Sequence, residues 1–148
     1  MSADKQVTED LIQTLEDGKK GFSDAADKLA DSKRSDLSSK FQAFSSQRTA
    51  FSAELERLAA EYGDRVHESG STSAALHRGW MALKDALTGS NPDGVLDAVE
   101  QGEKHAISEY EKALKEDISG ELRTVVNRQC TEIKSALETI QALRKAAN

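Results

Sequence analysis

The stretch that decides the fold most clearly is NPDGVLDAVEQGEKHAISEYEKAL, residues 91–114. Asn91 can cap a helix, and Pro92 suits the first helical position because a proline lacks the N–H that has no partner there. Apolar or small side chains then recur every three or four residues, which predicts a helix over residues 92–116 with one buried face. Glu103 stands near the middle of that face, so a charge interrupts it there.

The same apolar spacing occurs in three further stretches, which predict helices over residues 8–31, 36–62 and 120–146. The first is expected to start at Thr8, a good N-cap that is followed by two acidic residues. Serine is frequent over residues 38–52 at positions away from the apolar seam, which predicts a hydrated face. Together, these amphipathic helices predict an all-helical bundle.

A connection of about 30 residues separates the second helix from the one that begins at Pro92, far more than a reversal between antiparallel neighbours needs. Its apolar stripe predicts a short extra helix over residues 73–87. At roughly 1.5 Å per residue, that helix could run along more than half of a bundle helix. We therefore expect a crossover that sets helix 92–116 parallel to helix 36–62, with up-down-up-down connectivity as the alternative.

Composition limits the class of protein. The 148 residues fit one domain over residues 1–148, and a single proline with 5% aromatics favours helices. The formal net charge of -6 makes nucleic acid and anionic membrane unlikely partners. No apolar run suggests a signal peptide or a membrane span, so a cytoplasmic location is expected. Cys130 is the only cysteine, which excludes a disulfide within the chain.

Polar residues interrupt the seams near the middle of the predicted bundle. Counting outward from the two hairpin turns puts Gly18 level with Arg48, and Glu103 about one turn from Gln129. These positions predict a buried polar layer in which Gly18 leaves room for Arg48 to reach Glu103. Gln129 is expected to satisfy the remaining hydrogen-bonding capacity. Pairing is favoured because a buried charge without a partner is costly, while the alternative is that the charged side chains turn outward to solvent.

The stretch LHRGW at residues 76–80 holds the only tryptophan and one of the three histidines. On a helix, Trp80 falls on an apolar stripe, and Gly79 falls on a stripe of small residues suited to close contact with another helix. His77 lies at the edge of the apolar stripe, and Arg78 lies on the opposite side. We interpret these four residues as a structural clamp for the connection, with an active site as the alternative.

Stretches from most of the chain carry a family resemblance: LEDGKKGF at 15–22, FSAELERL at 51–58, SGSTSAALHRGWMALKDALTG at 69–89, AVEQGEKHAISEYEKAL at 98–114, and RQCTEI and ALR near the C-terminus. Together they resemble an uncharacterised bacterial family of ferritin-like four-helix-bundle proteins, known as a domain of unknown function. LHRGW is the most specific part of the likeness. The resemblance implies a ferritin-like bundle and raises the question of a di-metal site.

Ferritin-like di-metal sites take a glutamate from each of two helices and a Glu-x-x-His pair from each of the other two. This sequence has no Glu-x-x-His. An arginine at the bundle centre would also supply the positive charge that a metal provides, so no metal or other cofactor is expected. The alternative is iron or another divalent metal, held by the carboxylates nearest the seams: Glu16, Glu54, Glu103 and Glu132.

Two main interpretations of the function follow. The first is a non-catalytic ferritin-like bundle of stress-associated or structural role that acts through binding or assembly, and the second is a metal-dependent oxidoreductase or metal-storage protein. A partner-binding signalling module is a third. The missing Glu-x-x-His favours the first, so no catalytic residue is assigned. A homodimer through helix faces is expected, and a stripe of small residues that suits it, or equally suits packing inside the subunit, is Ala98, Gly102 and Ala106.

Overall fold

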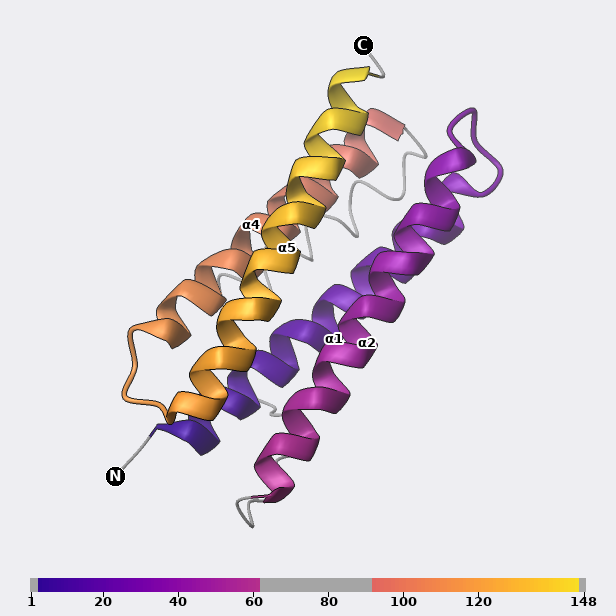
Figure 1. The fold of residues 1–148 in the computed structure, drawn as a ribbon. Coiled ribbons are helices and arrows are strands. Elements are labelled where there is room, and N and C mark those ends of the chain that lie inside the picture. The colour runs from indigo at the N-terminus through magenta and orange to yellow at the C-terminus, as the bar shows by residue number, and fades with distance from the viewer. Residues whose placement is uncertain (1–2, 62–91, 147–148) are drawn as a thin grey trace.

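The structure is a computed structural model that describes residues 3–61 and 92–146. These residues form four helices and no strand (Figure 1): α1 (Asp4–Leu29), α2 (Asp36–Glu61), α4 (Pro92–Leu114) and α5 (Gly120–Ala146). The prediction of an all-helical protein with four long helices is confirmed for this part of the chain. Outside it lie the extra helix predicted over residues 73–87 and the motif of His77, Arg78, Gly79 and Trp80.

The first two helices form an antiparallel hairpin in which serines of α2 face α1. The Ser45 hydroxyl donates to the backbone carbonyl oxygen of Lys19 at 2.9 Å, and the Ser52 hydroxyl donates to the Glu16 carboxylate at 3.3 Å. The predicted hydrated face is wrong at both serines, which are 9% and 3% exposed. These small side chains can lie between the two helices because α1 accepts their hydrogen bonds.

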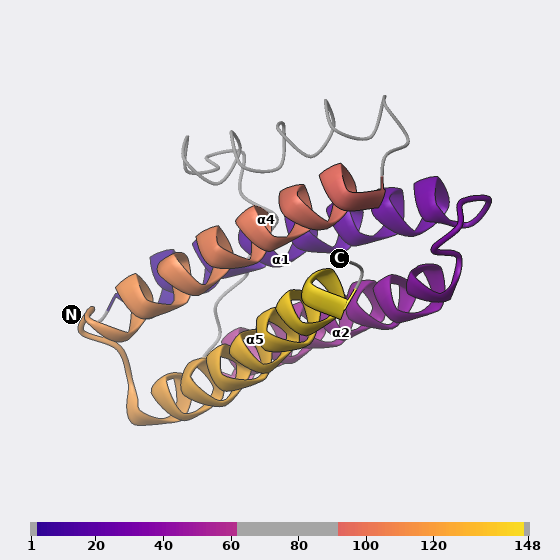
Figure 2. The ribbon, with the colours of Figure 1, turned by 90° about the horizontal axis from the view of Figure 1, so that it is seen from above.

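The hydrophobic core has two halves, one toward each end of the bundle. One half joins Phe22 near the end of α1, Leu37 near the start of α2, Val95 near the start of α4 and Ile140 near the end of α5. The starts of α2 and α4 therefore lie together, and these helices run in the same direction (Figure 1 and Figure 2). This is the parallel arrangement that the long connection predicts, and the up-down-up-down alternative is wrong.

Helix α1 begins four residues earlier than predicted. Thr8 is 3% exposed inside the helix, so it is no N-cap. Two contacts to the link between α4 and α5 hold the additional turn. The Ala3 N–H donates to the carbonyl oxygen of Asp117 at 2.7 Å, and the Asp4 carboxylate accepts from the Ser119 N–H at 2.8 Å. Because these contacts are tertiary, the local capping signal at Thr8 does not set the start of the helix.

Two helices end before the predicted residues 31 and 116, and polar groups meet the last carbonyls of both. The N–H and the hydroxyl group of Ser32 donate to the carbonyl oxygen of Leu29 at 3.1 and 2.8 Å. The Arg123 guanidinium donates to the carbonyl oxygens of Leu114 and Glu116 at 2.6 and 3.0 Å. These bonds replace those that another helical turn would make. No helix in the described ranges has the length and apolar character needed to cross a membrane.

Candidate functional site

A charge pair lies at the centre of the bundle. Arg48 of α2 donates to both carboxylate oxygens of Glu103 of α4, with Nη1–Oε1 and Nη2–Oε2 distances of 2.5 and 2.6 Å. The two residues are 1% and 0% exposed. Helices α2 and α4 lie diagonally across the bundle, each packed on α1 and α5 (Figure 2). The pair therefore crosses the interior of the bundle, and the structure brings together the two charged residues that the sequence places there.

Further contacts of Arg48 come from α1 and α2. Its Cζ lies 5.1 Å from the centre of the Phe22 ring, a distance at which a cation interacts with the face of an aromatic ring. The Arg48 Nε donates to the Gln47 side-chain oxygen at 3.2 Å. Gly18 is buried one helical turn before Phe22, so it lies on the same face of α1. Each nitrogen of the guanidinium thus has a hydrogen-bond partner, as a buried arginine needs.

Gln129, the fourth residue of the predicted polar layer, belongs to a second network. Its side-chain oxygen accepts from the Tyr110 hydroxyl at 2.7 Å. Its nitrogen donates to the Phe51 carbonyl oxygen at 3.2 Å and to the Glu54 carboxylate at 2.9 Å. Among the described residues, no hydrogen bond joins Gln129 to the Arg48–Glu103 pair, so the expectation that its amide completes that pair is wrong. The amide of Gln129 is instead bonded to Tyr110, to the Phe51 carbonyl oxygen and to Glu54.

Within residues 3–61 and 92–146, the two other titratable side chains of the core, Tyr110 and Cys130, are held in their neutral forms. Burial raises the pKa of the fully buried Tyr110 phenol far above its ordinary range. Burial also raises the pKa of the Cys130 thiol. Because the thiolate is the reactive form of cysteine, this side chain is a poor nucleophile. The site therefore presents a partnered ion pair and neutral groups, with no activated nucleophile among them.

The carboxylates considered as alternative metal ligands have other partners. Glu16 accepts from Lys19 at 3.4 Å, and Glu103 is paired with Arg48. Arg128 of α5 donates to Glu54 and also to Glu132, the latter at 3.3 Å. Within residues 3–61 and 92–146, no group of three His, Cys, Asp or Glu side chains is placed to hold a metal ion. Glu54 and Glu132 share Arg128 as a partner, and neither forms a metal-binding group with the other carboxylates in that part of the chain.

Glu54 joins the buried network to the surface. Burial alone would raise the pKa of its carboxyl group, but hydrogen bonds from Gln129 and Arg128 outweigh burial and lower it. The side chain is 30% exposed, and that of Arg128 is 48% exposed. A chain of polar contacts therefore runs from Tyr110 in the core through Gln129 and Glu54 to Arg128 at the surface.

The stripe of small residues on α4 is part of the interior. Ala98 and Ala106 are 4% and 2% exposed, and Gly102 is also buried. Of the two alternatives for this stripe, packing inside the subunit is the one that the structure shows. Any contact between copies of the chain would have to use other surfaces.

Sequence reasoning missed Tyr110 and Arg128 as members of the polar system. Tyr110 lies seven residues after Glu103, so the two share one face of α4, and its hydroxyl group was available as a partner for Gln129. Arg128 gave no such signal, since it lies on the exposed side of α5 and reaches Glu54 through its long side chain.

The structure thus defines an all-helical bundle with a buried arginine–glutamate pair at its centre. Comparison with family models places the chain in the family described as Domain of unknown function (DUF2383), whose model matches residues 6–116. The match includes Arg48 and Glu103, while Gln129 lies beyond it. No curated protein and no solved structure matches the chain.

Proposed function

We propose that this protein is a non-catalytic bundle of ferritin-like ancestry that works without a metal centre and acts through binding or assembly. The observation that supports this proposal is the Arg48–Glu103 pair at the centre of the bundle. A di-metal protein needs several inward carboxylates whose charge is balanced by the metal ions. Here the Arg48 guanidinium balances the charge of the buried Glu103 carboxylate, so this carboxylate needs no metal ion as its counter-charge.

The energetics of the pair support the same proposal. A divalent cation that used Glu103 would have to displace Arg48, leaving its guanidinium buried without a counter-charge. Breaking a buried pair in this way costs about 3–5 kcal/mol. The sequence also lacks the Glu-x-x-His pairs that supply the imidazole ligands of ferritin-like di-metal sites. The partner that we propose is a protein, either a second copy or another chain, in the cytoplasm, since the net charge of -6 disfavours nucleic acid and anionic membrane.

Elemental analysis of the purified full-length protein, combined with its mass in solution, tests the proposal. We expect no stoichiometric metal, and a defined oligomer or complex. After incubation with ferrous iron, the natural chain should stay free of iron. The variant Arg57→Met should also stay free of iron, because it loses only an exposed arginine of α2, the helix that carries the buried Arg48. Stoichiometric iron in the natural chain would instead support the metal-binding alternative.

The metal-binding alternative has one supporting observation. Each of the four described helices carries one candidate carboxylate, in the order Glu16, Glu54, Glu103 and Glu132. If these residues bound iron, the variant Glu103→Gln would no longer bind the metal. In the presence of iron it would then unfold more easily than the natural, iron-loaded chain. Under our proposal, adding or chelating iron changes the unfolding of neither chain.

A further inference from the structure

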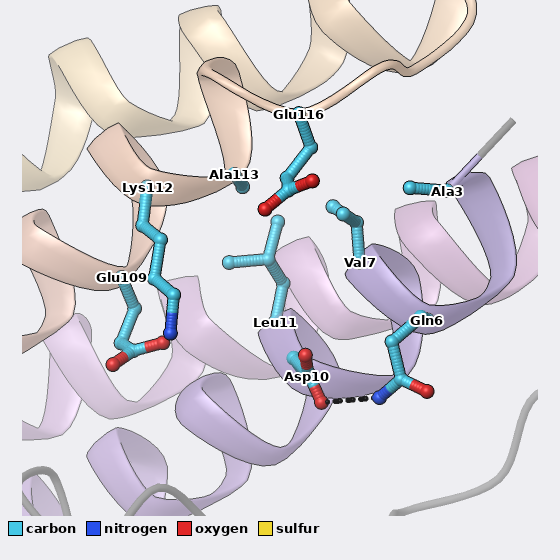
Figure 3. Close-up of a pocket in the computed structure, with 9 residues that line it drawn as sticks. All are labelled: Ala3, Gln6, Val7, Asp10, Leu11, Glu109, Lys112, Ala113 and Glu116. Atoms are coloured by element: carbon cyan, nitrogen blue, oxygen red, sulfur yellow. Dashed lines mark hydrogen bonds between the residues drawn. The ribbon is translucent and has the colours of Figure 1, made fainter.

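A cavity of about 140 Å³ opens between the first turns of α1 and the last turns of α4 (Figure 3). Its floor is apolar and consists of Val7, Leu11 and Ala113, which are 6%, 1% and 6% exposed. A cavity of about 150 Å³ accommodates a molecule of the size of benzene. A ligand with about six non-hydrogen atoms therefore matches the volume available here.

The rim of this cavity is charged. It carries three carboxylate groups and one ammonium group, so its net charge is negative. The ammonium group of the rim belongs to Lys112 and the carboxylates to Asp10, Glu109 and Glu116. In the view of Figure 3, the apolar side chain of Leu11 lies between the Asp10 and Glu116 carboxylates. The cavity thus offers a negative group, an apolar surface and a second negative group.

We propose that this cavity binds a short linear aliphatic diamine, with its methylene chain against Val7, Leu11 and Ala113 and its ammonium groups at Asp10 and Glu116. Carboxylates form strong, charge-assisted hydrogen bonds with ammonium donors. The apolar floor gains free energy when methylene groups cover it. A four-carbon diamine, 1,4-diaminobutane, has six non-hydrogen atoms and combines both features in a molecule of the right size.

Other classes of ligand fit the lining less well. In the described ranges, no three His, Cys, Asp or Glu side chains are placed to hold a metal ion, so a bare divalent cation would lack ligands. An anion would meet the net negative charge of the rim. Gln6 donates one hydrogen bond to Asp10 at 2.9 Å, but a carboxylate has further lone pairs for an ammonium group. This inference does not depend on the metal-free interior proposed above.

The test is a titration of the full-length protein with 1,4-diaminobutane, followed by the NMR signals of methyl groups. We expect saturable shifts at Val7, Leu11 and Ala113, and none at Val99 and Ile140 in the other half of the core. 1,4-Butanediol has the same chain length without the charges, and we expect it to bind at least about tenfold more weakly. The absence of shifts at the cavity with the diamine, or equal binding of the diol, would overturn the proposal.

Three variants test the role of the two carboxylates. Asp10→Asn and Glu116→Gln should each weaken diamine binding about tenfold, because each removes one charge-assisted contact. Asp27→Asn removes a carboxylate from the exposed side of α1, away from the cavity, and should leave the affinity unchanged. Equal weakening in all three variants would show general attraction of a cation to an acidic protein and would overturn the assigned site.

Discussion

Among the ion pairs that link the described helices, a central pair and a group near one end differ in their access to water. At the centre, Arg48 and Glu103 join α2 to α4 and are almost fully buried. Near one end, Arg144 of α5 faces three carboxylates of α4, with its Nη1 2.9 Å from Asp97 Oδ1. The Arg144 and Asp97 side chains are 29% and 51% exposed. Both groups therefore join two helices by short contacts, but in different surroundings.

This difference teaches that distance alone does not set the contribution of an ion pair. When one partner of an exposed pair is removed, water solvates the other, and the change in stability is small. When one partner of a buried pair is removed, the remaining charge has neither water nor a counter-charge. Arg48 and Glu103 should therefore each require the other as a counter-charge, whereas the residues of the Arg144 group should tolerate substitution.

The largest expected effect is that of breaking the central pair. Glu103→Leu leaves the Arg48 guanidinium buried without its counter-charge and should lower the free energy of unfolding by about 3–5 kcal/mol. Urea denaturation followed by circular dichroism measures this change. The matched control is Glu111→Leu on the same helix, because Glu111 is 54% exposed in its pair with Lys134 and its loss should change stability by less than about 0.5 kcal/mol.

The double variant Arg48→Met, Glu103→Leu sharpens the interpretation of this first result. It removes both charges and replaces them with apolar side chains, so it should recover most of the stability that Glu103→Leu loses. If the double variant did not regain stability, the space left in the core or the shape of the new side chains, rather than the unpaired charge, would be the cause of the loss. A Glu103→Leu variant as stable as the natural chain would contradict the buried pair itself.

The next largest effect is expected at the polar network that runs from the buried Tyr110 to the exposed Arg128. Tyr110→Phe keeps the volume of the ring but removes the hydrogen bond to the side-chain oxygen of Gln129. This buried acceptor then lacks its donor, and we expect a loss of about 1–2 kcal/mol in the free energy of unfolding. A loss below about 0.5 kcal/mol would show that another donor or a water molecule replaces the hydroxyl group.

The helices and the central pair were accessible from sequence because their signals repeat. Arg48 interrupts the apolar seam of one predicted helix, and Glu103 interrupts that of another. Once the hairpin turns are placed, these interruptions predict where the two charges lie along the bundle. Geometry then leaves few partners for a charge that faces inward. The length of the connection between α2 and α4 predicts that these helices run parallel, because a long connection can cross over to the other end of the bundle. This prediction concerns the direction of a whole helix and does not depend on the position of any single side chain.

The parts that sequence did not predict depend on tertiary contacts of single groups. The start of α1 is set by Ala3 and Asp4, which meet a link more than a hundred residues away in the chain. Ser45 is polar but lies in the interface with α1, because a backbone carbonyl there accepts its hydrogen bond. Gln129 bonds to Tyr110 instead of the central pair. No periodic pattern carries such information, since each case depends on one or two particular groups in another part of the chain.

At the exposed end of the comparison, Arg144→Met should have a small and salt-dependent effect. It removes the contacts to α4 but keeps much of the apolar side chain, and we expect a loss of about 0.5–1 kcal/mol at low ionic strength. The loss should shrink in about 1 M salt, which screens exposed charges. Glu103→Leu should keep most of its effect in the same salt. Equal salt dependence of the two variants would remove the distinction between the buried and the exposed group.

The smallest effect concerns pH and Glu54, which lies between the two extremes of exposure. Because the folded state lowers the pKa of this carboxyl group, its stabilising contribution is fully present above the pKa in the unfolded chain. The contribution is lost as pH falls through the lower pKa of the folded state. Urea denaturation of the natural chain and of Glu54→Gln should therefore show a difference at neutral pH that narrows below about pH 4.5.

The matched control for this measurement is Glu121→Gln, at an exposed position in the first turn of α5. Its difference in stability from the natural chain should stay small at every pH, because within the described residues Gln129 and Arg128 bond to Glu54 and not to Glu121. A Glu54→Gln difference that stays constant as pH falls would mean that the bonds from Gln129 and Arg128 hold the carboxyl group equally well in its neutral form. The protonation state of Glu54 would then not couple the buried network to the solvent.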